Sequence, residues 1–228
     1  MRLRLIFYLS TISLVFGCTS GNRTNVNYNK NIIKAQVCMN NFYFYASPKS
    51  LDSAFMYLAE VKNGYCADSN RLVNLHMSTV YFLKGDYKNA IKIYESLDAS
   101  EFSFPEYKRI IINKIRAKEA GAKEKYAQRM QYYSDILGDL DAFLNRNISI
   151  RDSILRLEDM SSLNELELAI ISMFGQKYYY ASKVKGADNA IVELDSLQRA
   201  INGNREYFEY LKKSVTGKDG YTMSVEFE

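Results

Sequence analysis

The sequence has few of the residues that build metal centres, disulfide frameworks or nucleophilic active sites. Its 228 residues include no Trp, two Pro, three Cys and a single His, His76. No HExxH, GxSxG, CxxC or phosphate-loop motif occurs, although these patterns mark common metal, nucleophile and nucleotide sites. We therefore expect no catalytic residues, no metal and no cofactor, and we expect a protein that is not an enzyme.

Neither sign of charge is in large excess. The chain has 30 Lys and Arg against 26 Asp and Glu, a net charge of +4, which is too small to indicate nucleic acid as a partner. Apolar residues make up 47% of the chain and aromatic residues 14%. This composition suffices for a buried core in one or at most two domains, and it excludes disordered and collagen-like classes.

Residues 1–17 have the pattern of an export signal. Two Arg precede an apolar run from Leu5 to Phe16, which is too short to span a bilayer comfortably. The run ends in Leu-Val-Phe-Gly-Cys at 14–18, which resembles the lipobox of bacterial lipoproteins. The resemblance implies that residues 1–17 are a lipoprotein signal peptide and that Cys18 becomes the acylated, palmitate-bearing first residue. An ordinary secretory signal with an incidental Cys is the alternative.

The lipoprotein resemblance also implies a location. Residues 18–30 are polar and rich in Asn, so we expect a flexible tether between the lipid on Cys18 and a folded domain. Thr19 rather than Asp follows Cys18, which in Gram-negative lipoproteins favours the outer membrane. We expect a protein anchored in the cell envelope through its lipid and facing the periplasm.

Two cysteines remain after Cys18. An exported chain enters an oxidising compartment, so Cys38 and Cys66 are a possible disulfide. Free Cys is also a common core residue. The sequence leaves both alternatives open.

Residues 31–214 contain apolar residues at helical spacing and favour an all-α fold of short antiparallel hairpins. In 50–61, for example, Leu51, Ala54, Phe55, Leu58 and Val61 share one face. Helices are expected at 31–45, 50–61, 70–84, 87–97, 105–120, 122–137, 139–159, 163–183, 187–201 and 203–214. Residues 215–228 alternate apolar and polar side chains, which predicts a short extended C-terminal tail.

Residues 71–104 resemble a tetratricopeptide repeat, a helical hairpin of 34 residues. The small residues Ser78 and Ala90 stand where its two helices cross, and Gly85-Asp86-Tyr87 forms the turn. The large positions are Met77, Tyr81 and Tyr94. The segments 51–61 and 187–197 are weaker echoes of the second helix. The resemblance implies hairpins stacked as a right-handed superhelix, called TPR-like below.

Such superhelices commonly bind a peptide or another protein on their concave face. By the resemblance, the inner positions of the repeat are Leu72, Leu75, Thr79, Phe82 and Leu83. They predict an apolar groove for a segment of another envelope protein. The alternative is that a neighbouring helix covers these residues, because apolar stripes usually belong to a core.

Charge is laid out in blocks. Residues 108–129 contain eight Lys or Arg and two Glu, whereas 135–167 contain eight acidic residues and three Arg. The basic block suits anionic lipid headgroups or an acidic protein surface. The alternatives are that the two blocks attract each other, or that they are solvated helix faces with pairs such as Glu119 and Lys123.

Two further hypotheses come from short patterns. Ser53, Ser153 and Ser196 lie in Asp-Ser-aliphatic triplets, which resemble the acceptor sites of a periplasmic O-glycosylation system. Each Ser also suits a polar position of an amphipathic helix.

The second functional hypothesis is an envelope hydrolase or glycan-binding protein, using carboxylates and the Tyr runs at 132–133 and 178–180. The preferred hypothesis is a non-catalytic, membrane-anchored scaffold.

Overall fold

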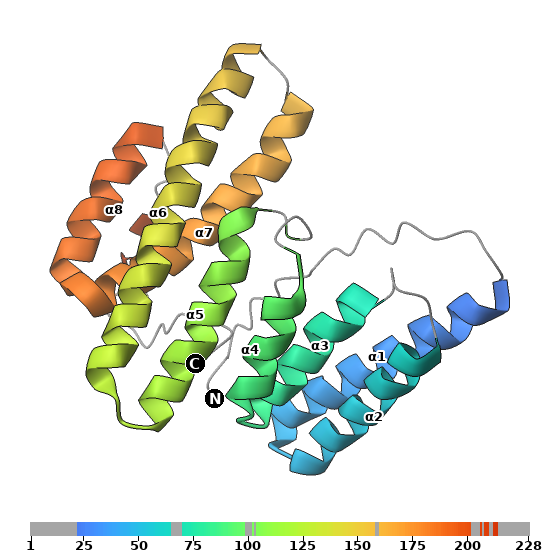
Figure 1. The fold of residues 1–228 in the computed structure, drawn as a ribbon. Helices are drawn as coiled ribbons and strands as arrows, with labels where there is room; N and C mark the ends of the chain where they lie inside the picture. Colours follow the sequence, from blue (N-terminus) through green and yellow to red (C-terminus); the bar gives the residue numbers. More distant parts are fainter. Residues whose placement is uncertain are drawn as a thin grey trace. The chain divides into compact units, whose positions relative to one another are not determined.

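The computed structural model describes residues 22–64, 70–98, 102, 104–157, 160–201, 206, 208–209 and 212–213. The chain divides into two compact units, residues 1–98 and 99–228. The described residues form eight α-helices and no strand (Figure 1). The all-α expectation is confirmed for this part of the chain. None of the described helices is long and apolar enough to cross a membrane.

The first unit consists of two helical hairpins. Its helices are α1 (Asn22–Tyr45), α2 (Pro48–Gly64), α3 (Asn70–Leu83) and α4 (Tyr87–Ser96). The helix α1 packs against α2, α2 against α3, and α3 against α4 (Figure 1). Only two residues, 46 and 47, separate α1 from α2. Because each helix packs against the next one in the chain, the order of these helices in space follows their order in the sequence.

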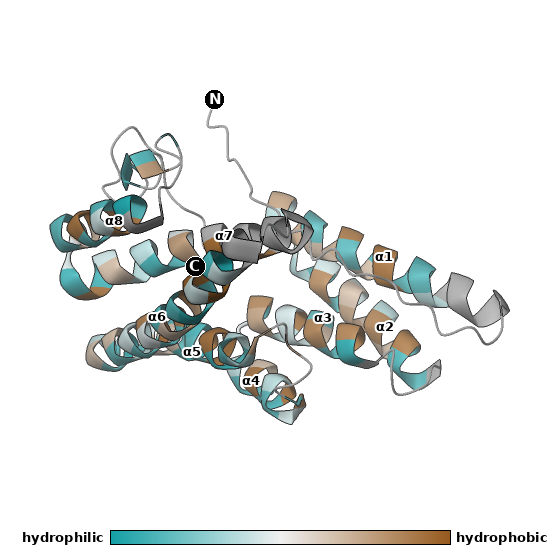
Figure 2. Ribbon diagram, turned by 90° about the horizontal axis from the view of Figure 1, so that it is seen from above, coloured by the Kyte–Doolittle hydropathy of each residue, from teal (hydrophilic) through white to brown (hydrophobic). Residues whose placement is uncertain are grey.

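The core of this unit lies among α1, α2 and α3. Its buried residues recur every three or four positions, so each helix turns one apolar stripe inward. They are Ile32, Ala35 and Met39 from α1, Leu51, Ala54, Leu58 and Val61 from α2, and Val73, Met77 and Val80 from α3. The face predicted for 50–61 is confirmed, with Phe55 half-buried against the same cluster. Figure 2 shows the alternation of apolar and polar positions along these helices.

The predicted tether at 18–30 is wrong over residues 22–30, because α1 begins at Asn22. The prediction relied on the Asn-rich composition of this segment and did not consider that Tyr28 could pack against the core. Tyr28 is half-buried and packs against the core of the first unit, in line with Ile32 and Ala35 on the inward face. A single aromatic side chain thus extends the amphipathic stripe of α1 by one turn.

The turn between α3 and α4 has the residues that its geometry requires. Gly85 has φ of 77°, a left-handed conformation that glycine adopts without a steric penalty. Asp86 caps α4, with its carboxylate accepting a hydrogen bond from the backbone N–H of Asn89 at 3.2 Å. The Gly85-Asp86-Tyr87 turn lies where the sequence predicts it.

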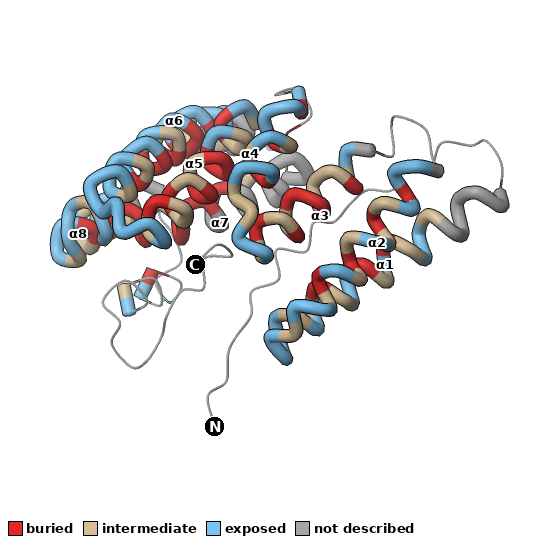
Figure 3. Tube along the Cα trace, turned by 60° about the horizontal axis from the view of Figure 1, so that its bottom comes forward, coloured by how far each residue is buried: buried red, intermediate tan, exposed pale blue. Residues whose placement is uncertain are grey.

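The second unit contains α5 (Pro105–Ala122), α6 (Tyr126–Leu157), α7 (Met160–Lys185) and α8 (Ala187–Ile201). Neighbouring helices in this series pack together. Its core is larger and more aromatic, with Phe143, Phe174, Tyr178 and Phe208 among its fully buried side chains. Figure 3 shows the buried positions concentrated along the facing sides of α5, α6 and α7.

One helix replaces the two that were expected at 122–137 and 139–159. The helix α6 runs through Gly138 without a break. Gly138 is exposed, while Leu137 and Leu140 on either side are buried. A glycine in a helix costs only about 1 kcal/mol relative to Ala, so the packing of its neighbours outweighs it. Gly186, with φ of 87°, does end a helix, as expected between 183 and 187.

The C-terminal expectations are tested only in part. Residues 206, 208–209 and 212–213 are helical, in agreement with the helix expected at 203–214. The extended tail expected at 215–228 lies outside the described residues, as do residues 1–17 and Cys18.

Candidate functional site

The five predicted groove residues all lie on α3, but most of them pack against neighbours. Leu72 and Leu83 are half-buried against the core of the first unit. Phe82 is 8% exposed, and its ring meets the edge of Tyr87 with centroids 5.8 Å apart. The predicted apolar groove therefore loses Phe82, whereas at the half-buried Leu72 and Leu83 it stays a prediction.

Leu75 and Thr79 are the remaining groove positions, and both are half-buried. The Thr79 hydroxyl donates to the Leu75 carbonyl one turn earlier, at 3.1 Å. A hydroxyl bonded within its own helix offers only its lone pairs to a ligand. These two residues alone do not make a groove.

The repeat-packing residues lie as a close helix crossing requires. Ser78 and Ala90 are both fully buried, and the Ser78 hydroxyl donates across the hairpin to the Ala90 carbonyl at 2.9 Å. Only small side chains allow two helix backbones to approach in this way. Met77 and Tyr94 are buried beside them, and Tyr81 packs against Phe55 with ring centroids 5.4 Å apart.

His76, the only His of the chain, contacts a side chain of the neighbouring helix α1. An amide nitrogen of Gln36 on α1 lies 3.4 Å from Nε2 of His76 on α3. Because an amide N–H donates, this contact favours a neutral ring that accepts at Nε2. Burial lowers the pKa of His76, in the same direction. Among the described residues, no cluster of His, Cys, Asp and Glu suits a metal ion.

The tyrosine runs do not form a sugar platform. Tyr133, Tyr178, Tyr179 and Tyr180 are all buried in the second unit, and only Tyr132 is half-buried. Burial raises the pKa of Tyr178 and of Tyr180 well above the ordinary value. The hydrolase or glycan-binding hypothesis loses the surface on which it depended, because these rings fill the core.

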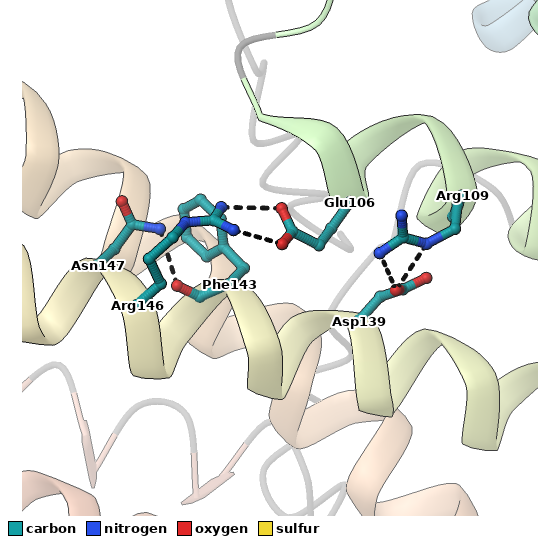
Figure 4. A network of polar contacts seen from close by, with 6 residues as sticks. All are labelled: Glu106, Arg109, Asp139, Phe143, Arg146 and Asn147. Atoms are coloured by element: carbon teal, nitrogen blue, oxygen red, sulfur yellow. Dashed lines mark hydrogen bonds and ion pairs between the residues drawn. The ribbon is translucent and has the colours of Figure 1, made fainter. Parts of the chain in front are cut away.

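Polar contacts join α5 to α6 in a row along their outer edge (Figure 4). Arg146 holds both carboxylate oxygens of Glu106, at 2.5 and 2.8 Å. Arg109 donates from Nε and Nη2 to one oxygen of Asp139, at 2.9 and 2.7 Å. Asn147 donates within α6 to the Phe143 carbonyl, at 2.7 Å. The two ion pairs fix the register of α5 against α6.

Glu106 is the most perturbed acid in this row. Its carboxylate is buried while the Arg146 side chain is 42% exposed. The hydrogen bonds from Arg146 hold the pKa of Glu106 below its usual value, and burial opposes this shift only in part. The Arg109–Asp139 pair joins one residue of the basic block to one residue of the acidic block. The expected Glu119–Lys123 pair is also formed, at 2.6 Å.

A buried lysine was missed by the sequence analysis. Lys114 on α5 is 8% exposed, and its ammonium donates to the side-chain oxygen of Gln176 on α7 at 2.6 Å. The ammonium also lies 5.9 Å from the centroid of the Tyr180 ring. One signal was available, since Lys114 follows Ile110 by four residues on an otherwise apolar face.

The turn between α5 and α6 carries a polar hollow. It encloses about 210 Å³. A smaller hollow of about 180 Å³ lies beside Arg129, Tyr133 and Lys183. The first is lined by Arg116, Glu119, Ala120, Lys123, Lys125, Gln128 and Tyr132.

Three basic side chains and one acidic side chain give the larger hollow an excess of positive charge. Lys123 is engaged by Glu119, and Lys125 is exposed. The surface is suited to a carboxylate or another anion rather than to an apolar ligand. It is the part of the basic block that the α5–α6 pairs leave accessible.

The proposed modification sites differ in accessibility. Ser53 is half-buried, whereas Ser153 and Ser196 are exposed, and the Ser153 hydroxyl donates to the Ser149 carbonyl. All three lie within helices. Cys38 is half-buried with a free thiol. Cys66 lies outside the described residues, so the Cys38–Cys66 disulfide stays a prediction.

No protein-family model matches the chain, and no significant match was found among curated proteins or solved structures.

Proposed function

We propose that this protein is a lipid-anchored helical-repeat scaffold that binds another protein in the cell envelope. The observation that carries the proposal is the α3–α4 hairpin, in which Ser78 and Ala90 meet across a close helix crossing. Hairpins of this kind expose extended surfaces that suit protein partners. The lipobox-like residues 14–18 support the anchor and the location.

The surface offered to the partner is the basic hollow at the α5–α6 turn. The apolar groove on α3 is largely covered, whereas Lys123 and Lys125 are exposed beside Gln128. Acidic side chains or a terminal carboxylate of the partner fit this charge. Partner recognition is then electrostatic, and it weakens as salt is raised.

Site-specific crosslinking in intact cells tests the partner. A photoreactive residue at position 128 should crosslink to one envelope protein, and a photoreactive residue at 192, exposed on α8, should not. Reversing charge with Lys123→Glu and Lys125→Glu should abolish the crosslink, while Lys88→Glu on the exposed face of α4 should leave it unchanged. Equal crosslinking from positions 128 and 192 would contradict this surface.

The anchor has its own test. Intact mass and metabolic labelling with palmitate should show an acylated chain that begins at Cys18, and Cys18→Ala should release the protein from the membrane fraction. A full-length chain with residues 1–17 uncut would refute the lipoprotein assignment. The same mass spectra test glycosylation, because a mass equal to the acylated polypeptide alone excludes it at Ser53, Ser153 and Ser196.

A further inference from the structure

The helix α1 has a second apolar stripe on the side opposite the core. Its inward face contains Ile32, Ala35 and Met39, all buried. The stripe of Ile33, Val37 and Phe44 is 58, 50 and 63% exposed. These residues are four and seven positions apart, so they line up along three turns of one face. An amphipathic helix that packs on one side only does not need this stripe.

The stripe differs from the other exposed apolar residues of the protein. Met56 on α2, Ile150 on α6 and Val192 on α8 are exposed singly, and Tyr126 and Met130 form one exposed pair on α6. Exposed apolar residues in such small numbers are ordinary for a protein surface. The exposed rings of Tyr43 and Tyr45 flank Phe44, one on each side of the stripe, at the end of the helix. Tyrosine is favoured at membrane–water interfaces because its ring is apolar and its hydroxyl is polar.

The charge of α1 indicates what covers the stripe. Among its 24 residues are Arg23, Lys30 and Lys34 and no Asp or Glu. The first acidic residue of the whole chain is Asp52. Lys30 is exposed one turn before Ile33, beside the stripe. A second copy of α1 would bring like charges together, whereas an anionic lipid surface attracts all three.

The length of chain before α1 brings the helix to the bilayer. Three residues separate Cys18 from Asn22, so these residues can span at most about 14 Å. The stripe begins about 17 Å and ends about 33 Å along α1 from Asn22, at about 1.5 Å per residue. A lipid on Cys18 would therefore hold the first turn of α1 near the headgroups, and the stripe reaches them when the helix lies along the surface.

We propose that α1 lies on an anionic membrane surface, with Ile33, Val37 and Phe44 inserted between the headgroups. The proposal extends the anchored scaffold described above and rests on its membrane location. One face of α1 holds the first unit together and the opposite face docks on lipid. The second contact turns a single lipid attachment point into a fixed orientation of the first unit.

Tryptophan fluorescence tests the proposal directly, because the chain has no Trp. The acylated protein carrying Val37→Trp is reconstituted into vesicles of phosphatidylethanolamine and phosphatidylglycerol with brominated acyl chains. The Trp emission should shift to the blue and be quenched by bromine. The matched control is Val192→Trp, an exposed position on the acidic helix α8, which should show neither effect. Circular dichroism verifies that both variants fold.

A second measurement separates docking from anchoring. The chain from residue 18 onward, with Cys18→Ser and Val37→Trp, is titrated with the same vesicles. Binding should weaken at least roughly tenfold when phosphatidylglycerol is omitted, because the basic helix then loses its electrostatic attraction. The double substitution Ile33→Gln and Phe44→Gln should weaken binding by a similar factor or more. Met56→Gln, on the neighbouring helix, should have no effect.

The outcomes are distinguishable. An acylated protein whose Val37→Trp emission is not quenched overturns the docking and leaves the anchor intact. A chain that is never acylated but still binds anionic vesicles through the stripe overturns the anchor and leaves the docking intact. A blue shift without vesicles, together with a doubled molecular mass, assigns the stripe to a second copy and overturns the proposal. Equal binding with and without phosphatidylglycerol refutes the choice of an anionic surface.

Discussion

Replacing Ala90 by Leu tests whether the α3–α4 crossing depends on small side chains. Ala90 and Ser78 are both 0% exposed, and the Ser78 oxygen lies 2.9 Å from the Ala90 carbonyl oxygen. The added carbon atoms of Leu have no space between backbones held this close, so α3 and α4 must move apart or Leu must leave its preferred rotamers. Overpacking of this kind costs about 1–3 kcal/mol.

The expected effect is large for a unit of this size. In domains of 60–100 residues, each kcal/mol shifts Tm by roughly 4–8 °C, so Ala90→Leu should lower the Tm of the first unit by roughly 5–20 °C. Urea unfolding followed by circular dichroism gives the free energy, and hydrogen exchange of α3 and α4 peptides locates the change. The two units need separate transitions in this assay, because a single midpoint is defined only for a two-state process.

The matched control introduces the same residue on the same helix. Lys88→Leu places Leu at an exposed position of α4, where substitutions usually change stability by less than about 0.5 kcal/mol. If Ala90→Leu is no more destabilising than Lys88→Leu, the crossing does not depend on small side chains. The interpretation of 71–104 as a TPR-like hairpin would then lose its physical basis.

Three further predictions concern the second unit. Tyr178→Phe should be neutral or slightly stabilising in urea unfolding, because the buried Tyr178 hydroxyl has no hydrogen-bond partner among the described residues and its removal ends a desolvation cost. Glu106→Gln should destabilise the protein at neutral pH by roughly 1 kcal/mol. The pKa of folded Glu106 lies below its unfolded value, so the contribution of its ion pair is complete above the usual Glu range and is lost as pH falls through the lower folded pKa. The difference between wild type and Glu106→Gln should therefore shrink on acidification, and Arg146→Ala should remove this pH dependence. Gln176→Leu should destabilise by about 1–3 kcal/mol, because it takes an acceptor from the buried Lys114 ammonium; an unchanged unfolding midpoint would contradict this role.

Proline and glycine residues predicted helix boundaries correctly where the packing of the neighbouring residues supports the same boundary. Pro105 begins α5 and Gly186 ends α7 where expected, because Pro suits the first turn of a helix and Gly adopts a positive φ after its end. A helix boundary was predicted at Gly138 and is not there, because glycine is also tolerated inside a long helix when its neighbours are buried. A single sequence does not state whether a glycine will be a cap or a tolerated interior residue.

The candidate site was harder to predict than the fold. Phe82 was assigned to a groove by its position in the repeat and Tyr178 to a sugar platform by its place in a Tyr run, but large aromatic side chains also favour burial in a core. The choice depends on tertiary neighbours, which helical periodicity does not specify. Lys114 shows the opposite error, since a lysine in a basic block is expected to be solvated, whereas its buried ammonium donates to the side-chain oxygen of Gln176 on α7.

The N-terminal start of α1 and its exposed apolar stripe bear on the proposed function. A residue-by-residue interpretation of 18–30 as a tether placed a flexible linker between lipid and domain, whereas the structure continues the helix to Asn22. A long flexible tether would let the domain move freely above the membrane and would make an exposed apolar stripe a liability for aggregation. A helix that begins so close to Cys18 has the opposite consequence. On the proposed acylation of Cys18, the start of α1 lies near the headgroups, and a helix lying along the surface places Ile33, Val37 and Phe44 where lipid can cover them. The short connection and the apolar stripe then serve the same proposed contact.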